Sequence, residues 1–358
     1  MKVLLISDCH STHICGVTRK QREVMNQLRL QNHIPMLIQS DLFWNMPPPY
    51  FKEVRITIPS PVSYIRLVNM IESFNPDYIH IFTEGTLGLM SSIHCTLVGR
   101  AYTTMRTTQF ENYVHNWFLH KCIRGYIESF HSFSKVCITP SPSLAKLYKH
   151  PSCVSILNGC NTSDFKAEGT VDFSISSLPR PLWLYVGRIS VEKNIDEFIN
   201  LTDKLPGTFI VVGDGPYLKH LPQKNNLYYL GWKKGKELSA IYRTCDVFVF
   251  PSKTDTFGQV MVEAMSSGLP VAAYPVIGPI DVVSDGVSGC LHEDLHKACL
   301  QAYKMKDSQK CITHASTFSW STMCTQFLEC QVLSRPTRPY IYSSLGFGVF
   351  VLVVTFLS

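Results

Sequence analysis

The chain has 358 residues, of which 45% are hydrophobic; it is too long for one ordinary hydrophobic core, so we expect two domains. Its net charge of +6 comes from 33 Lys and Arg against 27 Asp and Glu. No dense basic run or basic-aromatic stripe accompanies this surplus, so no nucleic-acid partner is indicated. The charge is compatible with acidic small ligands such as nucleotide phosphates, or with anionic lipid headgroups.

The cysteines indicate a reducing compartment. Thirteen of them are scattered from Cys9 to Cys330, with no C-x2-C pair and no His/Cys cluster at zinc spacing. An odd number without a framework indicates reduced thiols on the cytosolic side of a membrane and no metal site.

Taken in chain order, the apolar runs predict strands that alternate with helices. The opening MKVLLISDCH has only five apolar residues before Asp8, which is typical of a first strand and too short for a signal peptide. We expect strands at residues 3–7, 33–39, 77–82, 135–140, 183–187, 208–213 and 246–251. Amphipathic segments between these runs predict an α/β fold with parallel sheets.

Each half of the chain reads as its own doubly wound, Rossmann-like domain. Polar, Gly and Pro residues concentrate at residues 158–181, which marks the join. We predict a first domain over residues 1–165 and a second over residues 166–334, with a cleft between them. A last helical stretch at about residues 319–333 is expected to cross back to the first domain.

Ligands of open α/β sheets bind beyond the carboxyl ends of the strands, so the loops after these runs are the candidate sites. After residues 3–7, a loop containing Gly16 leads into a helix from about Val17. Free N–H groups and the helix dipole favour an anion at such a place. The loop lacks the G-x-G-x-x-G pattern of dinucleotide sites, and a purely structural glycine is the alternative.

Two loops of the second half carry charge and glycine. Arg188 follows one strand directly and Lys193 lies five positions later; together they could neutralise a diphosphate. The alternative is a solvated loop with a surface Glu192/Lys193 pair. Gly213, in the next loop, permits a tight turn or the close approach of a ligand.

The segment TDTFGQVMVEAM, residues 254–265, carries two acids. Asp255 is expected in a loop before a helix and Glu263 in the helix's second turn. The N–H groups of Gly258, Gln259 and Val260 would face an anion at the helix start. A nucleotide sugar could bind to all three of these groups. Its phosphate would bind at the helix start, its ribose at one acid and its sugar at the other. The alternatives are a capping role for Asp255 and an exposed helix face for Glu263.

These motifs match a known family. In family order the chain contains GVTR, DLF, PDYIHIFTEGTLGL, TPS, LYVGRISVEKN, VVGDGP, DVFVFPSKTDTFGQVMVEAMSSGLPVAAYP and GPIDVV. It resembles the family-4 retaining glycosyltransferases of GT-B architecture, close to the branch of bacterial GDP-mannose-dependent α-mannosyltransferases and sulfoquinovosyl-lipid synthases. The resemblance implies transfer of a hexose with retention and without a metal cofactor.

The resemblance also implies roles for the donor-side residues. Glu263 would hold the donor ribose, and Asp255 with the backbone from Phe257 to Val260 would cradle the sugar and phosphate. Arg188 and Lys193 match the pair that binds the diphosphate, and Gly16 matches the glycine that closes over the donor. Charge stabilisation of this kind requires neither a nucleophile nor a metal.

On the acceptor side the chain departs from the family pattern. We assign Glu84, Arg106 and Thr107 to this side, and Thr107 stands where members usually carry a histidine. Threonine cannot act as a base at neutral pH. Arg106 or another group would then orient the acceptor, or the activity would be altered.

The last residues predict a membrane anchor. Residues 340–358 run for 19 residues without a charge and follow Arg335 and Arg338, and a transmembrane helix needs roughly 20 apolar residues. We expect a basic, proline-containing linker and tail anchor over residues 335–358, with the body on the cytosolic face. The alternative is a terminal segment packed on the protein.

By resemblance the favoured donor is GDP-mannose, with a UDP-sugar as the second choice. The acceptor would be a lipid-linked or membrane-proximal glycan. From a different class of function, Thr107 allows a catalytically weak protein that only binds nucleotide sugars. A phosphorylase or an epimerase of the same fold would need other residue sets in the first domain, which the sequence does not contain at recognisable positions.

Overall fold

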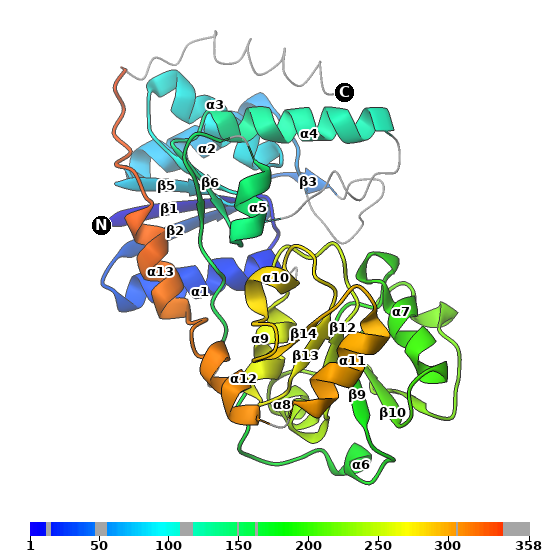
Figure 1. Ribbon diagram of the computed structural model, residues 1–358. Coiled ribbons are helices and arrows are strands. Elements are labelled where there is room, and N and C mark those ends of the chain that lie inside the picture. Colours follow the sequence, from blue (N-terminus) through cyan, green and yellow to red (C-terminus); the bar gives the residue numbers. More distant parts are fainter. Residues whose placement is uncertain are drawn as a thin grey trace. The chain divides into compact units, whose positions relative to one another are not determined.

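The computed structural model describes residues 1–11, 16–46, 56–107, 117–148, 150–161, 164–305 and 307–338. The chain divides into two compact units: unit 1 is Met1–Ile156 with Cys324–Ser358, and unit 2 is Leu157–Met323. The second division falls inside helix α13, Trp320–Glu329, so the chain leaves unit 1 once and later returns to it (Figure 1).

Unit 1 is built on a six-stranded sheet in the order β2-β1-β5-β6-β7-β8, in which every neighbouring pair is parallel. The strands are β1 Lys2–Ser7, β2 Ile34–Gln39, β5 Tyr78–Ile81, β6 Thr103–Met105, β7 Val136–Thr139 and β8 Cys153–Ser155. A short antiparallel pair, β3 Asn45–Met46 and β4 Ile56–Thr57, stands apart from this sheet. The helices of unit 1 are α1 Gly16–Leu30, α2 Pro61–Phe74, α3 Thr86–Val98, α4 Trp117–Ser132 and α5 Pro142–Leu147, with the 3-10 turn η1 Ser40–Leu42.

Local sequence signals begin the helices of unit 1. Ser60 accepts a hydrogen bond from the backbone N–H of Ser63, and Pro61 follows it at the first helical position of α2. Ser141 and Pro142 begin α5 in the same way. A serine cap followed by proline fits a helix start, because proline lacks the N–H that would otherwise be unsatisfied there.

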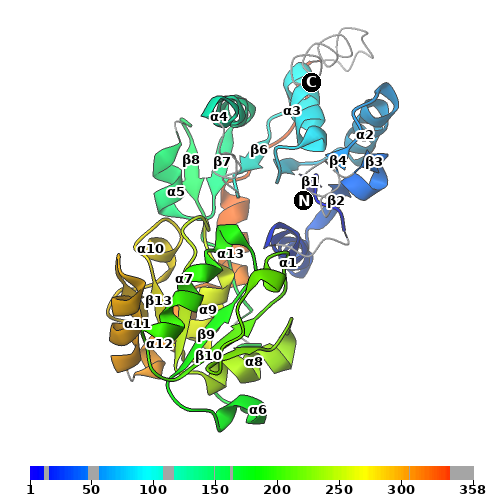
Figure 2. The same cartoon turned by 90° about the vertical axis from the view of Figure 1, so that its right-hand side faces the viewer.

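The sheet of unit 1 is covered on both faces. Helices α2 and α3 lie on one side and α1 on the other (Figures 1 and 2). Leu4 and Ile6 of β1 pack in one core cluster with residues of α2 and α3. On the other face, His80 of β5 lies between Phe82 and Phe327 of α13, with ring centroids 4.6 and 4.7 Å away. Burial on both faces explains why five of the six residues of β1 are buried.

Unit 2 repeats this architecture with a parallel sheet in the order β11-β10-β9-β12-β13-β14. The strands are β9 Leu182–Val186, β10 Thr208–Val212, β11 Leu227–Tyr229, β12 Val247–Phe250, β13 Val271–Ala273 and β14 Gly289–Leu291. The α-helices are α6 Phe173–Ser176, α7 Ile195–Asn200, α8 Gly235–Thr244, α9 Gln259–Ser266, α10 Pro279–Val282, α11 Leu295–Lys304 and α12 Ser308–Ala315. The 3-10 turns are η3 Val191–Lys193, η4 Leu201–Asp203 and η5 Leu218–His220.

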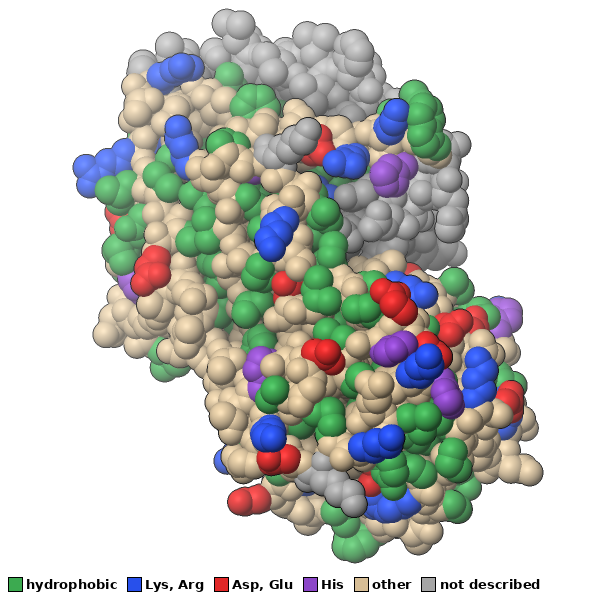
Figure 3. All heavy atoms as spheres, in the orientation of Figure 1, with side chains coloured by type: hydrophobic (Ala, Val, Ile, Leu, Met, Phe, Trp, Pro, Cys, Tyr) green, Lys and Arg blue, Asp and Glu red, His purple; other side chains and the backbone are tan. Residues whose placement is uncertain are grey.

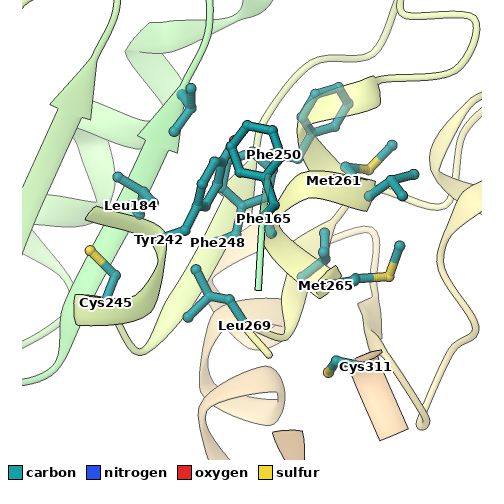
Figure 4. Close-up of a cluster of buried hydrophobic side chains, with 14 of the residues drawn as sticks. Phe165, Leu184, Tyr242, Cys245, Phe248, Phe250, Met261, Met265, Leu269 and Cys311 are labelled. Atoms are coloured by element: carbon teal, nitrogen blue, oxygen red, sulfur yellow. The ribbon is translucent and has the colours of Figure 1, made fainter. Parts of the chain in front are cut away.

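Successive residues of β9 enter different cores. Leu184 belongs to one core cluster of unit 2, while Trp183 and Tyr185 belong to the other. The first cluster contains Tyr242, Phe248 and Met265 (Figure 4). This alternation is expected of a strand that is buried on both faces, since its side chains point to opposite sides in turn.

Residues 157–165, which we assigned to the first domain, lie in unit 2. The reason is packing: Phe165 is only 5% exposed and meets the ring of Tyr242 at 5.7 Å, and Cys160 belongs to the same cluster. The polar composition of this stretch does not reveal that Cys160 and Phe165 belong to the hydrophobic core of unit 2.

The predicted fold class, α/β with two parallel-sheet, Rossmann-like domains, is confirmed. In each sheet the strand order reverses beside the first strand, between β1 and β5 and between β9 and β12. Such switch points are where open α/β sheets bind ligands. The predicted cleft between the domains stays a prediction.

Two further expectations concern surface and membrane. On the face shown in Figure 3, Lys and Arg side chains are interspersed with Asp and Glu and form no continuous basic stripe. Over residues 1–338, apart from the gaps given above, no helix is both long enough and apolar enough to cross a membrane. The predicted tail at residues 340–358 lies outside the described residues.

Candidate functional site at the carboxyl edges of the two sheets

In unit 2, the loops after β9 and β10 are joined by backbone hydrogen bonds. The N–H of Gly187 donates to Val212 O at 3.0 Å, and the N–H of Ile189 donates to Asp214 O at 2.9 Å. The phenol of Tyr185 donates to Arg188 O at 2.8 Å. Burial, followed by the negative charges of Asp255 and Glu192, raises the pKa of Tyr185, which keeps the phenol protonated as a donor. The Arg188 side chain is exposed on this fixed loop.

Gly213 is required by the approach of these two loops. Its φ is +143°, and a Cβ atom there would lie 1.9 Å from Gly187 O. Gly215 repeats the situation against Ile189 O at 2.2 Å. No real Cβ tolerates such distances, so both glycines have a structural role in the turn; the predicted donor contact of Gly213 stays a prediction.

Lys193 and Asp255 come together across two loops. Their side chains form an ion pair, Lys193 Nζ to Asp255 Oδ1, with 28% and 18% of the side chains exposed. The loops are fastened by Asn194 Nδ2, which donates to Pro251 O at 3.0 Å, and by Thr254 Oγ1, which donates to Glu192 O at 3.1 Å. Lys193 therefore pairs with the first acid of the 254–265 segment, a partner that neither the predicted diphosphate role nor the alternative pairing with Glu192 included.

Asp255 does not cap helix α9. The N-cap is Gly258, at φ +82°, and it makes no side-chain cap bond. The other oxygen of Asp255, Oδ2, is buried and has no hydrogen-bond partner among the described residues. Gly278 packs against the same loop, since a Cβ there would lie 2.4 Å from Asp255 O. Asp255 therefore offers one oxygen to Lys193 and keeps one acceptor unused.

The helix α9 residues divide between core and loop contacts. Phe257 is 3% exposed and meets Phe318 at 5.9 Å, so its side chain belongs to the core. Gln259 Nε2 donates to Gly159 O at 3.2 Å. The carbonyl oxygen of Val260 lies 3.4 Å from the phenol of Tyr242. The backbone groups of Phe257, Gly258, Gln259 and Val260 stay predicted donor contacts.

Glu263 is buried rather than exposed. It is 2% exposed, and the phenol of Tyr242 donates to its Oε2 at 3.3 Å. Burial of a carboxylate costs free energy unless polar partners compensate it. The alternative of a solvated helix face is thus wrong, and the second acid of the segment is held inside the unit on helix α9.

In unit 1, Gly16 is the first residue of α1, and a Cβ there would meet nothing within 4 Å. Packing among the described residues therefore does not demand a glycine. Residues 12–15 of the same loop lie outside the described residues.

Asp8, which sequence reasoning did not single out, caps helix α3 from the end of β1. Its carboxylate accepts from the N–H of Leu87 at 2.6 Å, the N–H of Gly88 at 3.2 Å and Thr83 Oγ1 at 2.8 Å. Burial raises the pKa of Asp8 and the negative charge of Glu84 adds to this, while the three hydrogen bonds act in the opposite direction. A Cβ on Gly85 would lie 2.4 Å from this carboxyl carbon.

Glu84 pairs with a histidine that was also missed. Its Oε1 lies 3.1 Å from His131 Nε2, and both side chains are about nineteen-twentieths buried, with 4% and 5% exposed. Arg106 is buried as well, and its guanidinium lies 3.8 Å from the ring centroid of Tyr148. Thr107 is half-buried at the end of the same loop. His131 could be found only from the fold, because its helix gives no motif.

Two groups of predicted residues result. Unit 2 holds Arg188, Lys193, Gly213, Asp255, Glu263 and the residues from Phe257 to Val260, whereas unit 1 holds Gly16, Glu84, Arg106 and Thr107. Within the described stretches of the chain, no three His, Cys, Asp or Glu side chains gather in a way that could hold a metal ion.

Comparisons with known proteins point to one family. The model for glycosyl transferases group 1 matches residues 172–310, which lie entirely within unit 2. A sulfoquinovosyl transferase of Arabidopsis thaliana is 30% identical over 266 residues, or 68% of this chain and 51% of that protein. A GDP-mannose-dependent alpha-mannosyltransferase of Corynebacterium glutamicum is 24% identical over 92% of this chain and 88% of its own.

Solved structures share the fold. A sucrose-phosphate synthase from Thermosynechococcus elongatus superposes with a TM-score of 0.71 at 17% identity, covering 92% of this chain and 98% of that one. An Anabaena protein in complex with UDP gives a TM-score of 0.68 at 18% identity, covering 92% and 99%. This chain spans about half the length of the Arabidopsis relative and nearly all of these structures. Residues 172–310 therefore form a glycosyl transferases group 1 domain, and the chain as a whole has the fold of these solved structures.

Proposed function

We propose that the protein is a retaining, metal-independent glycosyltransferase that moves a hexose from a nucleotide-diphosphate sugar to a hydroxyl group. The observation that carries this proposal is the edge of unit 2, where the exposed Arg188 and the Lys193–Asp255 ion pair lie on loops fastened to each other. Cations held in this way stabilise the charge that develops on a leaving diphosphate, without reorganisation during the reaction.

Each donor-side residue has a proposed role. Arg188 and Lys193 bind the diphosphate, Arg188 through its planar fork and Lys193 as a point charge. Asp255 holds the sugar through its second oxygen, Oδ2, which has no partner among the residues described. Glu263 holds the ribose, and the backbone at the start of α9 binds phosphate.

We propose GDP-mannose as the donor, and the name of a related protein supports this proposal. The Corynebacterium protein that matches along 92% of this chain is named a GDP-mannose-dependent mannosyltransferase. A UDP-sugar is the second candidate, because an Anabaena structure of the same fold holds UDP. A third candidate function is binding of a nucleotide sugar with little turnover, because Thr107 stands where members of the family usually carry a histidine.

We propose further that the acceptor is a lipid-linked or membrane-proximal glycan and that the protein works on the cytosolic face of a membrane. This rests on the uncharged residues 340–358. Fractionation of cells that express the full chain, compared with a chain ending at residue 338, tests the anchor. Equal release of both chains into the soluble fraction would contradict it.

The donor proposal is tested by thermal unfolding of unit 2 in the presence of GDP-mannose, GDP, UDP-glucose or UDP. A true donor stabilises the folded state by about 2.7 kcal/mol at one hundred times its Kd. The Glu263→Ala variant should lose most of this stabilisation. The matched control is Glu237→Ala on α8, whose side chain is 69% exposed and which should respond as the wild type. Equal responses of Glu263→Ala and wild type would show that the donor site is misplaced.

A further inference from the structure

Cys137 and Cys153 lie side by side at the edge of the unit 1 sheet. Cys137 belongs to β7 and Cys153 to β8, the last strand in the sheet order. The two strands are parallel, and these two residues are direct partners in the register. Side chains of register partners project from the same face of a sheet. Both cysteines are free thiols, so the fold presents a pair of sulfur atoms on one face.

The strand pairing sets the distance between the two backbones. Neighbouring strands lie about 4.8 Å apart, and a disulfide spans Cα separations of about 4.4–6.8 Å. The thiol of Cys137 also donates a hydrogen bond to Cys153, so the two sulfur atoms point toward each other. A bond between them therefore requires rotation of side chains and no rearrangement of the sheet.

The two thiols differ in access and in charge. Cys137 is 1% exposed, whereas Cys153 is half-buried and can be reached from solvent. The hydrogen bond from Cys137 lowers the pKa of Cys153 against the effect of burial, and a hydrogen bond from Thr139 lowers it further. The same hydrogen bond, followed by burial, raises the pKa of Cys137. Because a thiolate is the nucleophile in thiol chemistry, Cys153 is the reactive member of the pair.

Another pair of neighbouring cysteines, in unit 2, lacks these properties. Cys290 of β14 and Cys299 of α11 interact electrostatically, but Cys290 Sγ donates to Gln301 Oε1 at 2.9 Å. The hydrogen of Cys290 thus points to an amide oxygen instead of to sulfur. Burial raises the pKa of both thiols, and Cys299 is 0% exposed. Proximity of two cysteines alone therefore does not reproduce the arrangement of Cys137 and Cys153.

We propose that Cys137 and Cys153 are a redox-sensitive modification site, at which a peroxide converts the two thiols into a reversible disulfide. Cys153 reacts with the peroxide, and Cys137 resolves the product. In a reducing compartment the pair returns to the thiol form when the peroxide is gone. The inference does not depend on the proposed transfer reaction, because both residues and their contacts lie within unit 1.

The reaction balances in atoms and electrons. Cys153 loses its proton to water, and its thiolate attacks one oxygen of hydrogen peroxide; the oxygen–oxygen bond breaks and hydroxide leaves. Cys153 is then a sulfenic acid. The sulfur of Cys137 attacks Cys153 Sγ, the sulfur–oxygen bond breaks, and the second hydroxide takes the proton of Cys137. The proton released by Cys153 neutralises the first hydroxide. One peroxide is reduced to two molecules of water, and the two thiols lose two electrons.

The bond would hold the edge of the sheet. β8 is the terminal strand of the sheet, and β7 is its neighbour. The disulfide closes a ring over the end of β7, helix α5 and the start of β8, and such a ring restricts the open states of the segment. We therefore expect the backbone amides of β8 to exchange hydrogen about tenfold more slowly in the oxidised chain.

The experiment treats the reduced full chain with one equivalent of hydrogen peroxide, digests it with trypsin without reductant and analyses the peptides by mass spectrometry. Cys137 and Cys153 fall in different peptides, because Lys146 lies between them. We expect a linked pair of peptides that dithiothreitol separates. The Cys122→Ser background is used throughout, because Cys122 is exposed and can link two copies of the chain.

Cys160 is the matched control, because it lies in the same tryptic peptide as Cys153 but is 3% exposed in the core of unit 2. Cys160→Ala should keep the linked peptides, whereas Cys153→Ser should lose them completely. A link that persists in Cys153→Ser would overturn the inference. So would a link between Cys290 and Cys299 of equal yield, since the reaction would then not distinguish the two pairs.

Hydrogen exchange covers the case in which the variants do not fold, since it needs no substitution at the pair. Mass spectrometry should show slower exchange in β8 after peroxide and unchanged exchange in β14, the terminal strand of the unit 2 sheet. Equal exchange of β8 before and after linking would mean that the bond does not join the native strands, which contradicts the inference. Oxidation of Cys153 to a sulfinic acid with Cys137 still free contradicts it as well, because Cys137 would then not resolve the first product.

Discussion

The carboxyl edge of unit 2 exposes cations, whereas the carboxyl edge of unit 1 buries carboxylates. In unit 2, Arg188 is exposed and Lys193 half-exposed, on loops held by backbone bonds and by glycines that no other residue can replace. In unit 1, Asp8 and Glu84 are each 6% exposed and are held by side chains and by a helix start. One topology thus gives one edge with exposed cations and another with buried carboxylates.

The comparison extends to the cations of each unit. Lys193 of unit 2 is paired with Asp255 and reaches solvent. Lys20 of unit 1, on α1, is 2% exposed, and its Nζ has no hydrogen-bond partner within the described part of the chain. The difference teaches that a lysine can bind an anionic ligand only where the fold leaves its ammonium group accessible. A buried lysine such as Lys20 mainly lowers the free energy of unfolding.

The largest effect should come from breaking the backbone of the unit 2 edge. Gly213→Ala would place a Cβ 1.9 Å from Gly187 O at a φ of +143°, so we expect unit 2 to lose about 4 kcal/mol or more of unfolding free energy. Urea unfolding followed by the fluorescence of Trp183 measures this loss.

The control for this variant is Gly286→Ala. Gly286 also has a positive φ, +74°, but nothing within 4 Å of a Cβ, so only backbone strain of about 1–2 kcal/mol is expected. Equal losses in the two variants would mean that the loop contact at Gly213 does not restrain the edge.

A smaller effect, of opposite sign, is expected from Lys20→Met in unit 1. Burial lowers the pKa of Lys20 from 10.5 to about 7, so between these values the unfolded chain binds more protons than the folded one. The contribution of Lys20 to stability should therefore rise as the pH increases from 7 to 10.5, and the full cost of its charge is present below pH 7. Burial raises the pKa of the Cys95 thiol, and a hydrogen bond with Cys153 followed by burial raises the pKa of Cys137, so these groups oppose the rise above pH 9. Lys20→Met should remove this slope and stabilise unit 1 by about 2–3 kcal/mol near pH 7.

Thermal unfolding at several pH values measures the effect of Lys20→Met. Lys135→Met replaces an exposed lysine of unit 1 and should retain the wild-type slope. A Lys20→Met variant that keeps the slope, or that is less stable than wild type at pH 7, would contradict the burial of an uncompensated cation. His80 next to Lys20 has a pKa held well below its usual value by burial and by the lysine charge, so it adds no slope in this window.

The smallest of the three effects is on donor affinity. Lys193→Ala should raise the Kd for the donor about 10- to 100-fold, because it removes a charge-assisted contact and leaves Asp255 unpaired. Titration calorimetry with GDP-mannose measures it. Lys224→Ala removes a lysine whose partner Asp203 is 71% exposed and should change the Kd by less than about twofold. If both variants bind alike, the cationic edge is not the donor site.

The sequence predicted the long strands and missed the short ones. Apolar runs such as VLLIS and TFIVV became β1 and β10, because such runs are unambiguous. Strands of three residues escaped: Val271–Ala273 of β13 lies between prolines and reads as a loop. What makes it a strand is its pairing with β12, a long-range contact that local composition does not contain.

The positions of the candidate residues could be predicted where their spacing along the chain is local. Asp255 and Glu263 lie eight positions apart on one loop and helix, so their proximity follows from the sequence. The Lys193–Asp255 pair spans 62 positions and could not be predicted from the loop alone. Lys20 reads as a surface charge in TRKQRE, although α1 turns it inward. His131 meets Glu84 47 positions away, in a pairing determined only by how α4 docks beside β5.

The return of the chain to unit 1 has a consequence for the order of folding during synthesis. Phe327 stacks on Phe82 with ring centroids 6.5 Å apart, and Arg100 donates to Ser334 O at 2.7 Å. These contacts use residues that a ribosome makes after all of unit 2. Unit 2 can therefore complete its core while unit 1 still lacks part of its own. The nascent protein must keep an unfinished first sheet soluble until helix α13 is released.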